Sequence, residues 1–184
     1  MDKKILTKEM IQEAEDYTPN AFKEAWCGET APKCFDRLAI TADGEPMPPM
    51  YMVNEGLKKR YLMTVFVKGY LKQECESDSG DEALMSEADY DRWAGSHVFC
   101  QMERLKKDKD ICDKCYDMLY DFRELDKRLS AQISGLLNAQ NDFVQRQNQL
   151  MSAQFMQLPQ VKEQLEEMIK RHEKDGAEND ETPV

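Results

Sequence analysis

The sequence predicts an all-α protein, in which a helical N-terminal region precedes a long coiled-coil-like helix or helical hairpin. The first observation is periodic, because apolar residues in the second half of the chain recur every three, four or seven positions. The second is the absence of proline from residues 111–158, where Gly135 is the only glycine. The third is a charged fraction of 33 %, well above the usual share, which favours extended helices with large solvated faces.

Two short helices are expected at the start of an N-terminal region that spans residues 1–75. Thr7 is a suitable N-cap for the first helix. For the second, Thr18 supplies a capping residue and Pro19 the residue preferred at the first helical position. Gly28 offers a C-terminal stop. Helices of this length are not stable alone in water, so both must pack against another part of the chain.

The middle of this region, residues 29–53, is irregular. An Asp-Gly turn signal at 43–44 predicts a small β-hairpin near 35–53, in which prolines restrict the return segment to an edge strand. From Asn54 onward the helical spacing returns and continues to the end of the region. The β-branched and aromatic run at 64–67 leaves a strand open there as the alternative.

An acidic segment separates the two halves of the chain. Residues 76–85 are predicted to be a flexible linker, because they combine carboxylates with small polar residues and contain no Lys or Arg. The surrounding stretch, 74–91, also has no Lys or Arg and forms a candidate acidic patch. Its members are Glu74, Glu76, Asp78, Asp81, Glu82, Glu87, Asp89 and Asp91.

Residues 86–172 are predicted to form the helical hairpin or coiled coil, with Ser86 and Asp89 as a capping pair at its start. The long helix carries an apolar seam with coiled-coil spacing for about three heptads. The seam residues are Ile111, Cys115, Met118, Phe122, Leu125, Leu129, Ile133, Leu136, Phe143 and Leu150. One amphipathic helix cannot bury such a seam alone, so a second helix or a second chain is expected to cover it.

Beyond its apolar part, the seam becomes polar. The Gln- and Asn-rich stretch 138–160 can form an interface that fixes the register between helices, and a solvated surface is the alternative. The tail, residues 173–184, has almost no apolar content and is expected to be disordered.

The formal net charge of −11 and the sequence pI of about 4.8 limit the classes of partner. Binding along a nucleic-acid backbone needs clustered Lys and Arg, so a nucleic-acid partner is disfavoured. No apolar stretch approaches the roughly 18 residues that a membrane helix needs, and the N-terminus lacks the pattern of a signal peptide. Six cysteines without an export signal favour free thiols or metal ligands, so the expected location is cytoplasmic.

Two pairs of residues form a candidate zinc site. An HxxC pair, His97 and Cys100, precedes a CxxC pair, Cys112 and Cys115, and each pair would share one face of a helix. Such pairs could clamp a helical hairpin near its turn. In the other interpretation no metal is bound, and Cys115 is a small apolar residue of the seam. The sequence favours the absence of a cofactor, with zinc as the alternative.

Catalytic motifs are missing from the sequence. It contains two histidines, and it has neither a phosphate-binding glycine-rich loop nor a GxSxG or HExxH motif. We therefore expect a non-catalytic adaptor or assembly factor that forms a homo-oligomer through residues 111–158 and contacts an unidentified protein. Two other classes stay open. The net charge is compatible with an acidic inhibitor or decoy that occupies a nucleic-acid-binding groove, and the candidate zinc ligands with a zinc-stabilised regulatory protein.

Overall fold

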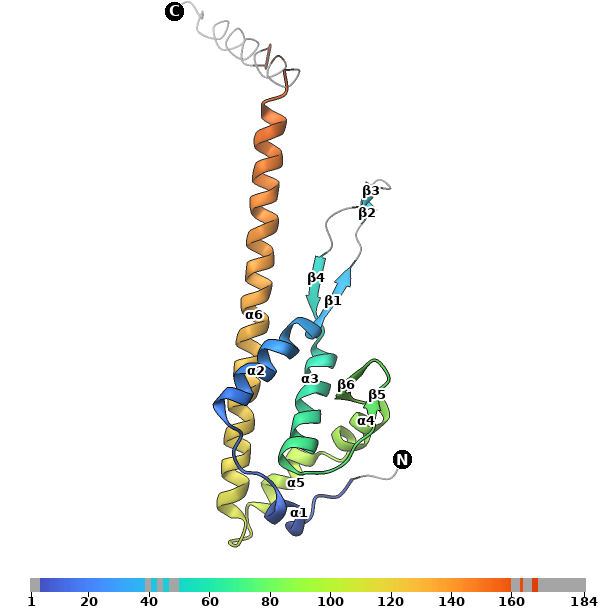
Figure 1. Cartoon of the computed structure of the whole chain (residues 1–184), viewed down its shortest axis with the longest axis vertical. Helices are drawn as coiled ribbons and strands as arrows, with labels where there is room; N and C mark the ends of the chain where they lie inside the picture. The colour runs from blue at the N-terminus through green and yellow to red at the C-terminus, as the bar shows by residue number, and fades with distance from the viewer. Residues whose placement is uncertain are drawn as a thin grey trace, which may run out of the picture. The chain divides into compact units, whose positions relative to one another are not determined.

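The computed structural model describes residues 4–38, 41–42, 45–46, 50–159, 163 and 167–168. The chain forms two units, Met1–Leu137 and Asn138–Val184. The fold is mostly helical with small hairpins, which confirms the predicted fold class (Figure 1). The boundary between the units lies within the long helix, whereas residues 76–85, predicted as the linker, lie inside the first unit.

The elements of the described residues follow one another in a simple order. They are α1 (Lys8–Glu13), α2 (Asn20–Thr30), the 3-10 helix η1 (Ala31–Cys34), β1 (Phe35–Leu38), β2 (Thr41–Ala42), β3 (Glu45–Pro46), β4 (Met50–Val53), α3 (Glu55–Thr64), the π-helix η2 (Val65–Tyr70), β5 (Ser77–Asp78), β6 (Asp81–Met85), α4 (Glu87–Gly95), α5 (Val98–Leu105) and α6 (Cys112–Met156).

Three helices begin at side-chain caps. The Thr7 hydroxyl accepts a hydrogen bond from the backbone N–H of the third residue of α1, and Asn54 and Ser86 do the same for α3 and α4. Helix α2 differs from the expectation, because its N-cap is Pro19, which has no side-chain acceptor. It also continues two residues past Gly28, since residues on both sides of this glycine are buried and tertiary packing outweighs the helix-ending tendency of glycine.

The small β-hairpin predicted near 35–53 is present. Strands β1 and β4 pair antiparallel from Phe35 opposite Val53 to Leu38 opposite Met50, and β2 pairs with β3 further out. The alternative strand at 64–67 does not form. These residues are buried at the end of α3 and in η2, where their apolar side chains enter the core.

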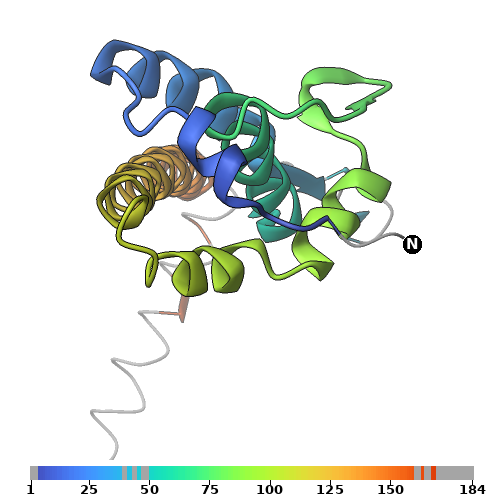
Figure 2. The same ribbon diagram turned by 90° about the horizontal axis from the view of Figure 1, so that it is seen from below.

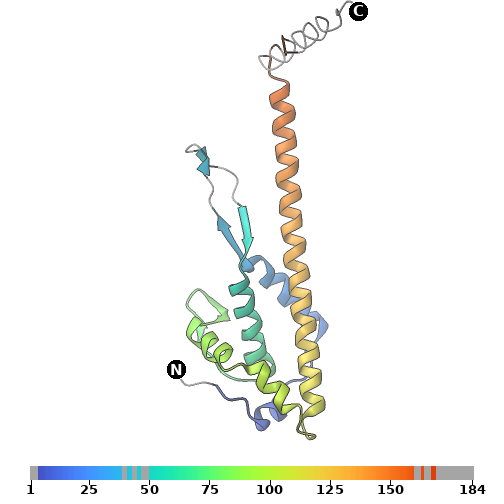
Figure 3. The ribbon, with the colours of Figure 1, turned by 180° about the vertical axis from the view of Figure 1, so that it is seen from behind.

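The acidic segment forms a second hairpin in place of a flexible linker. Strands β5 and β6 pair antiparallel and lie beside α3 (Figures 1 and 3). The carboxylate of Asp78 lies 2.8 Å from the Arg60 guanidinium, and that of Asp81 lies 2.7 Å from the Lys33 ammonium. The segment is ordered, and not a flexible linker, because cations from α3 and η1 neutralise carboxylates that have no cation nearby in the sequence.

The core of the first unit lies where α6 meets the other helices. Figure 2 shows α2, α3 and α5 around the first part of α6. An aromatic cluster joins η2, α5 and α6: the ring centroids of Phe66, Phe99 and Phe122 lie 4.9–5.2 Å apart, and the Tyr70 ring lies 6.1 Å from that of Phe122. Helix α6 has 45 residues and is therefore about 68 Å long. Within the described chain, no helix combines the length and the apolar content that a membrane crossing requires.

Candidate functional site

The apolar seam of α6 changes its environment along the helix. Its first part is covered by the chain's own helices. The buried members are Ile111, Cys115, Met118, Leu125, Leu129 and Ile133, and the half-buried ones are Phe122 and Leu136. Residues 111–136 of the seam therefore belong to the core of the first unit and leave little apolar surface for another chain.

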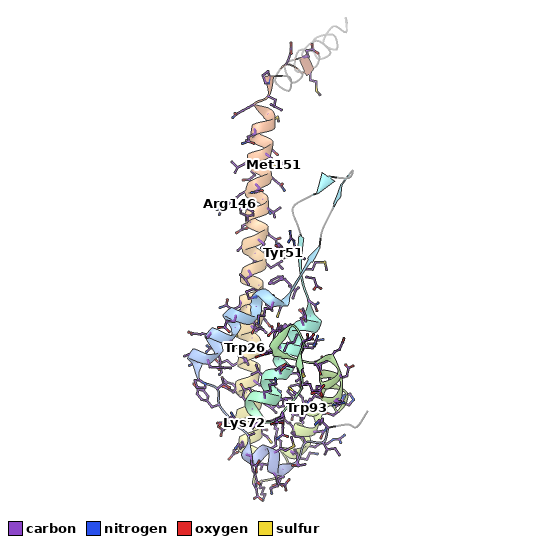
Figure 4. The ribbon with its side chains drawn as sticks, turned by 45° about the vertical axis from the view of Figure 1, so that its right-hand side comes forward. Trp26, Tyr51, Lys72, Trp93, Arg146 and Met151 are labelled. Atoms are coloured by element: carbon purple, nitrogen blue, oxygen red, sulfur yellow. The ribbon has the colours of Figure 1, made fainter. Side chains whose placement is uncertain are left out.

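The rest of the seam is exposed in the second unit. The side chain of Phe143 is 62 % exposed and that of Leu150 is 64 % exposed. Val144 and Met151 follow these residues in the sequence and are also exposed, and Met151 projects from α6 in Figure 4. Among the residues of 138–159 whose side chains the structure describes, none is buried. A helix with this much exposed apolar surface is typical of an interaction site.

These exposed apolar residues form an ordered stripe together with three glutamines. Residues seven apart lie on nearly the same face of a helix, about 10.5 Å apart along its axis. The stripe has two apolar rows, one of Phe143 and Leu150 and the other of Val144 and Met151. A row of glutamines lies between them. We call this set the exposed stripe: Gln140, Phe143, Val144, Gln147, Leu150, Met151 and Gln154.

The exposed stripe is almost uncharged. Over residues 138–158 the sequence has only two charged residues, Asp142 and Arg146, although a third of the whole chain is charged. Their opposite charges are four residues apart on the helix, a spacing at which such side chains attract each other. The segment therefore carries no net charge in a chain whose net charge is −11.

A buried ion pair fixes α2 to α6 in the first unit. The Lys23 ammonium contacts the Asp121 carboxylate and lies 2.9 Å from that of Glu124. Asp121 also accepts hydrogen bonds from the Tyr70 hydroxyl at 2.7 Å and from the backbone N–H of Thr18 at 2.9 Å. Burial lowers the pKa of Lys23, but these carboxylates outweigh that effect and raise it. The sequence analysis missed this pair, whose only signal is a lysine on the buried face of α2.

An apolar cavity of about 370 Å³ opens at the surface of the first unit. Side chains of α3, α4, α5 and α6 line it, and the exposed His97 and Cys100 lie among its lining residues. The apolar lining consists mainly of Leu62, Met63, Tyr90, Val98, Phe99 and Phe122. The cavity can receive an apolar group, and the sequence analysis did not identify it because its walls come from four separate segments.

The four candidate zinc ligands occupy different environments. His97 precedes α5 with a left-handed backbone (φ 54°) and is exposed, as is Cys100. Cys112 is half-buried, and Cys115 is buried in the core, where desolvation raises the pKa of its thiol. In the part of the chain that the structure describes, no group of three or more His, Cys, Asp or Glu side chains is placed to hold a metal ion.

The acidic patch is divided between exposed and paired carboxylates. Asp89 is buried, where it accepts a hydrogen bond from the backbone N–H of Glu76 at 2.7 Å and lies 2.9 Å from Arg92. With Asp78 and Asp81, three of the eight acidic residues are ion-paired inside the chain. The remaining five, Glu74, Glu76, Glu82, Glu87 and Asp91, are exposed. The decoy interpretation, which depends on this patch, stays a prediction.

Comparison of the chain with protein-family models, with curated proteins and with solved structures found no match. Within the described residues, the feature that points most directly to an interaction is the exposed stripe of α6.

Proposed function

We propose that this protein is a non-catalytic adaptor or assembly factor that self-associates through the exposed stripe of α6. One observation carries the proposal: the apolar seam is buried up to Ile133 and exposed from Phe143 onward. The exposed part keeps the seven-residue spacing with which helices pair in coiled coils. Compared with the sequence-based expectation of an interface over residues 111–158, the proposed interface is shorter and covers residues 138–156.

The charge distribution supports a second copy of the chain as the partner. Two copies with a net charge of −11 each repel one another, so contact is most favourable where the surface is neutral. Residues 138–158 form such a surface, because their two charges cancel. A strongly basic partner, by contrast, would find no complementary charge on the exposed stripe.

The amount of apolar surface predicts a pair of moderate strength. Each chain contributes four apolar side chains from the stripe, and each is worth about 1.5–3 kcal/mol when fully buried. Association itself costs about 4–15 kcal/mol. The free energy gained by burial exceeds the cost of association only moderately. The fraction of oligomer is therefore expected to depend on protein concentration.

An adaptor also needs surface for another protein. The first unit offers an apolar cavity of about 370 Å³, and none of the residues that line it belongs to the proposed interface at 138–156. A cavity of this size accommodates one or two apolar side chains of a partner protein.

The test is absolute molar mass by light scattering over a range of protein concentrations, with a reductant present. We expect the wild-type protein to give a multiple of 21.4 kDa. The variant Phe143→Glu/Leu150→Glu should give 21.4 kDa, because it places two charges in the stripe of each chain. The matched control, Gln145→Glu/Ser152→Glu, places the same charges on the opposite face of α6 and should keep the wild-type mass. A monomeric wild type, or an unchanged mass for Phe143→Glu/Leu150→Glu, contradicts the proposal.

A further inference from the structure

We infer that two copies of α6 pair parallel and in register, so that Gln140, Gln147 and Gln154 of one chain each face the same glutamine of the other. This inference rests on the proposed self-association and adds the direction and the alignment of the two helices.

The three glutamines lie in the middle of the exposed stripe. They recur every seven residues, and their row lies between the two apolar rows of the exposed stripe. Two helices that bury both apolar rows must therefore also bring the glutamine row into the contact. Gln140 is half-buried within the single chain, and Gln147 and Gln154 are exposed, so the three carboxamides are available to a second copy.

The carboxamide of glutamine favours contact with an identical side chain. A glutamine side chain has two N–H donors and an oxygen acceptor, so two identical side chains that face each other can exchange hydrogen bonds. A carboxamide buried against Phe or Leu loses its bonds to water without replacement, at a cost of about 1–3 kcal/mol. Pairing glutamine with glutamine avoids this cost three times along the stripe.

Only one arrangement pairs the three glutamines with their own counterparts. In a parallel, in-register pair, every residue lies at the height of its equivalent, so all three layers are matched. In an antiparallel coiled coil, the glutamine row of one chain faces the neighbouring Phe143 and Leu150 row of the other. A parallel pair shifted by one heptad matches only two glutamine layers. Polar residues at core positions are known to fix register and direction in this way.

Disulfide trapping tests the direction. The background protein carries Cys75→Ser, Cys100→Ser and Cys112→Ser, which removes every thiol that is not buried. Into it we place either Gln140→Cys or Gln154→Cys, and oxidise each variant separately. A disulfide needs Cα atoms within about 7 Å of each other. The parallel pair therefore predicts a covalent dimer for both variants on non-reducing gels. The control Ser152→Cys, on the opposite face of α6, and the oxidised background itself should stay uncrosslinked.

The outcomes separate the two proposals. An antiparallel pair can bring at most one of the two positions opposite itself, because they are about 21 Å apart along the helix. If one variant or neither is crosslinked while light scattering still gives a multiple of 21.4 kDa, self-association stands and the parallel register is wrong. If the background protein is monomeric by light scattering, both proposals are wrong. Crosslinking of both variants together with an uncrosslinked Ser152→Cys supports the parallel pair.

Discussion

The Lys23 ammonium on α2 donates a hydrogen bond to the Asp121 carboxylate on α6, and both groups are withdrawn from solvent. The Lys23 side chain is 0 % exposed and that of Asp121 is 6 % exposed. The same carboxylate accepts hydrogen bonds from Tyr70 and Thr18, so it joins three segments that are up to about one hundred residues apart. Burial together with the Asp121 hydrogen bond raises the pKa of Tyr70, which keeps its hydroxyl protonated as a donor.

Removing the cation of this pair should destabilise the protein strongly. We expect Lys23→Met to lower the free energy of unfolding by about 3–5 kcal/mol, because it leaves the buried Asp121 carboxylate without its counter-charge. The double variant Lys23→Met/Asp121→Leu should recover part of this loss, since no uncompensated charge then remains. Urea unfolding followed by circular dichroism measures both values.

The control for this experiment is an exposed ion pair. Lys72 lies 3.7 Å from Glu15, and about half of each side chain is exposed. Exposed pairs contribute about 0–1 kcal/mol, so Glu15→Gln should leave stability nearly unchanged. An equally small effect of Lys23→Met would contradict the conclusion that the buried ion pair of Lys23 and Asp121 fixes α2 to α6.

The sequence predicted those parts of the fold that depend on neighbouring residues. The caps at Thr7 and Ser86 were identified because a cap and the N–H that it binds are three residues apart. The β5–β6 hairpin was not predicted. It depends on Arg60 and Lys33, which lie 18 and 48 residues from the carboxylates that they bind.

The seam of α6 shows the same division. Its spacing identified the apolar face of the helix, but spacing does not show which part the chain covers by itself. That part depends on α2, α3 and α5, which lie around the first part of α6 in Figure 2, whereas Phe143 and Leu150 are exposed. The buried lysine escaped notice because composition gives no sign of a partner one hundred residues away.

The carboxylate of Asp81 should make stability depend on acid pH. Hydrogen bonds from Lys33 and from the Tyr61 hydroxyl lower its pKa from 3.8 to about 2. Because the folded pKa is below the unfolded one, the stabilisation is complete above pH 3.8 and is lost as the pH falls to about 2. We expect Asp81→Asn to cost up to about 2 kcal/mol near neutral pH. Below pH 2 the difference between the variant and the wild type should vanish.

Urea unfolding at a series of pH values checks this prediction. Glu82→Gln serves as the matched control, because Glu82 is the exposed neighbour of Asp81 on the same strand. The prediction fails if the difference in unfolding free energy between Asp81→Asn and the wild type stays constant from neutral pH to pH 2, because the charge of the carboxylate would then not contribute to stability.

The six free thiols should differ in reactivity. Burial raises the pKa of Cys27 and Cys115, and it raises the pKa of Cys34 to about 11, so little thiolate forms at these positions near neutral pH. Cys100 is exposed on α5. With a thiol-specific reagent at about pH 8, we expect Cys100 to react at once and the three buried thiols to react only after unfolding. Cys100→Ser should remove the fast phase, and rapid labelling of Cys34 in the folded protein would contradict the packing described above.

Alanine substitutions on the two parts of the seam should affect different properties: the stability of the single chain in the buried part, and association in the exposed part. Leu129 is 0 % exposed, so Leu129→Ala leaves a cavity and should lower the free energy of unfolding by about 2–5 kcal/mol at any protein concentration. Leu150 is 64 % exposed in the single chain, so Leu150→Ala should change the free energy of unfolding of the first unit little. It should instead weaken self-association, which lowers the molar mass measured at a given protein concentration. Urea unfolding at low protein concentration and light scattering at high concentration measure the two effects separately. A concentration-independent loss of stability in Leu150→Ala would mean that the chain covers this leucine itself, and the exposed stripe would then have no free surface for a second copy.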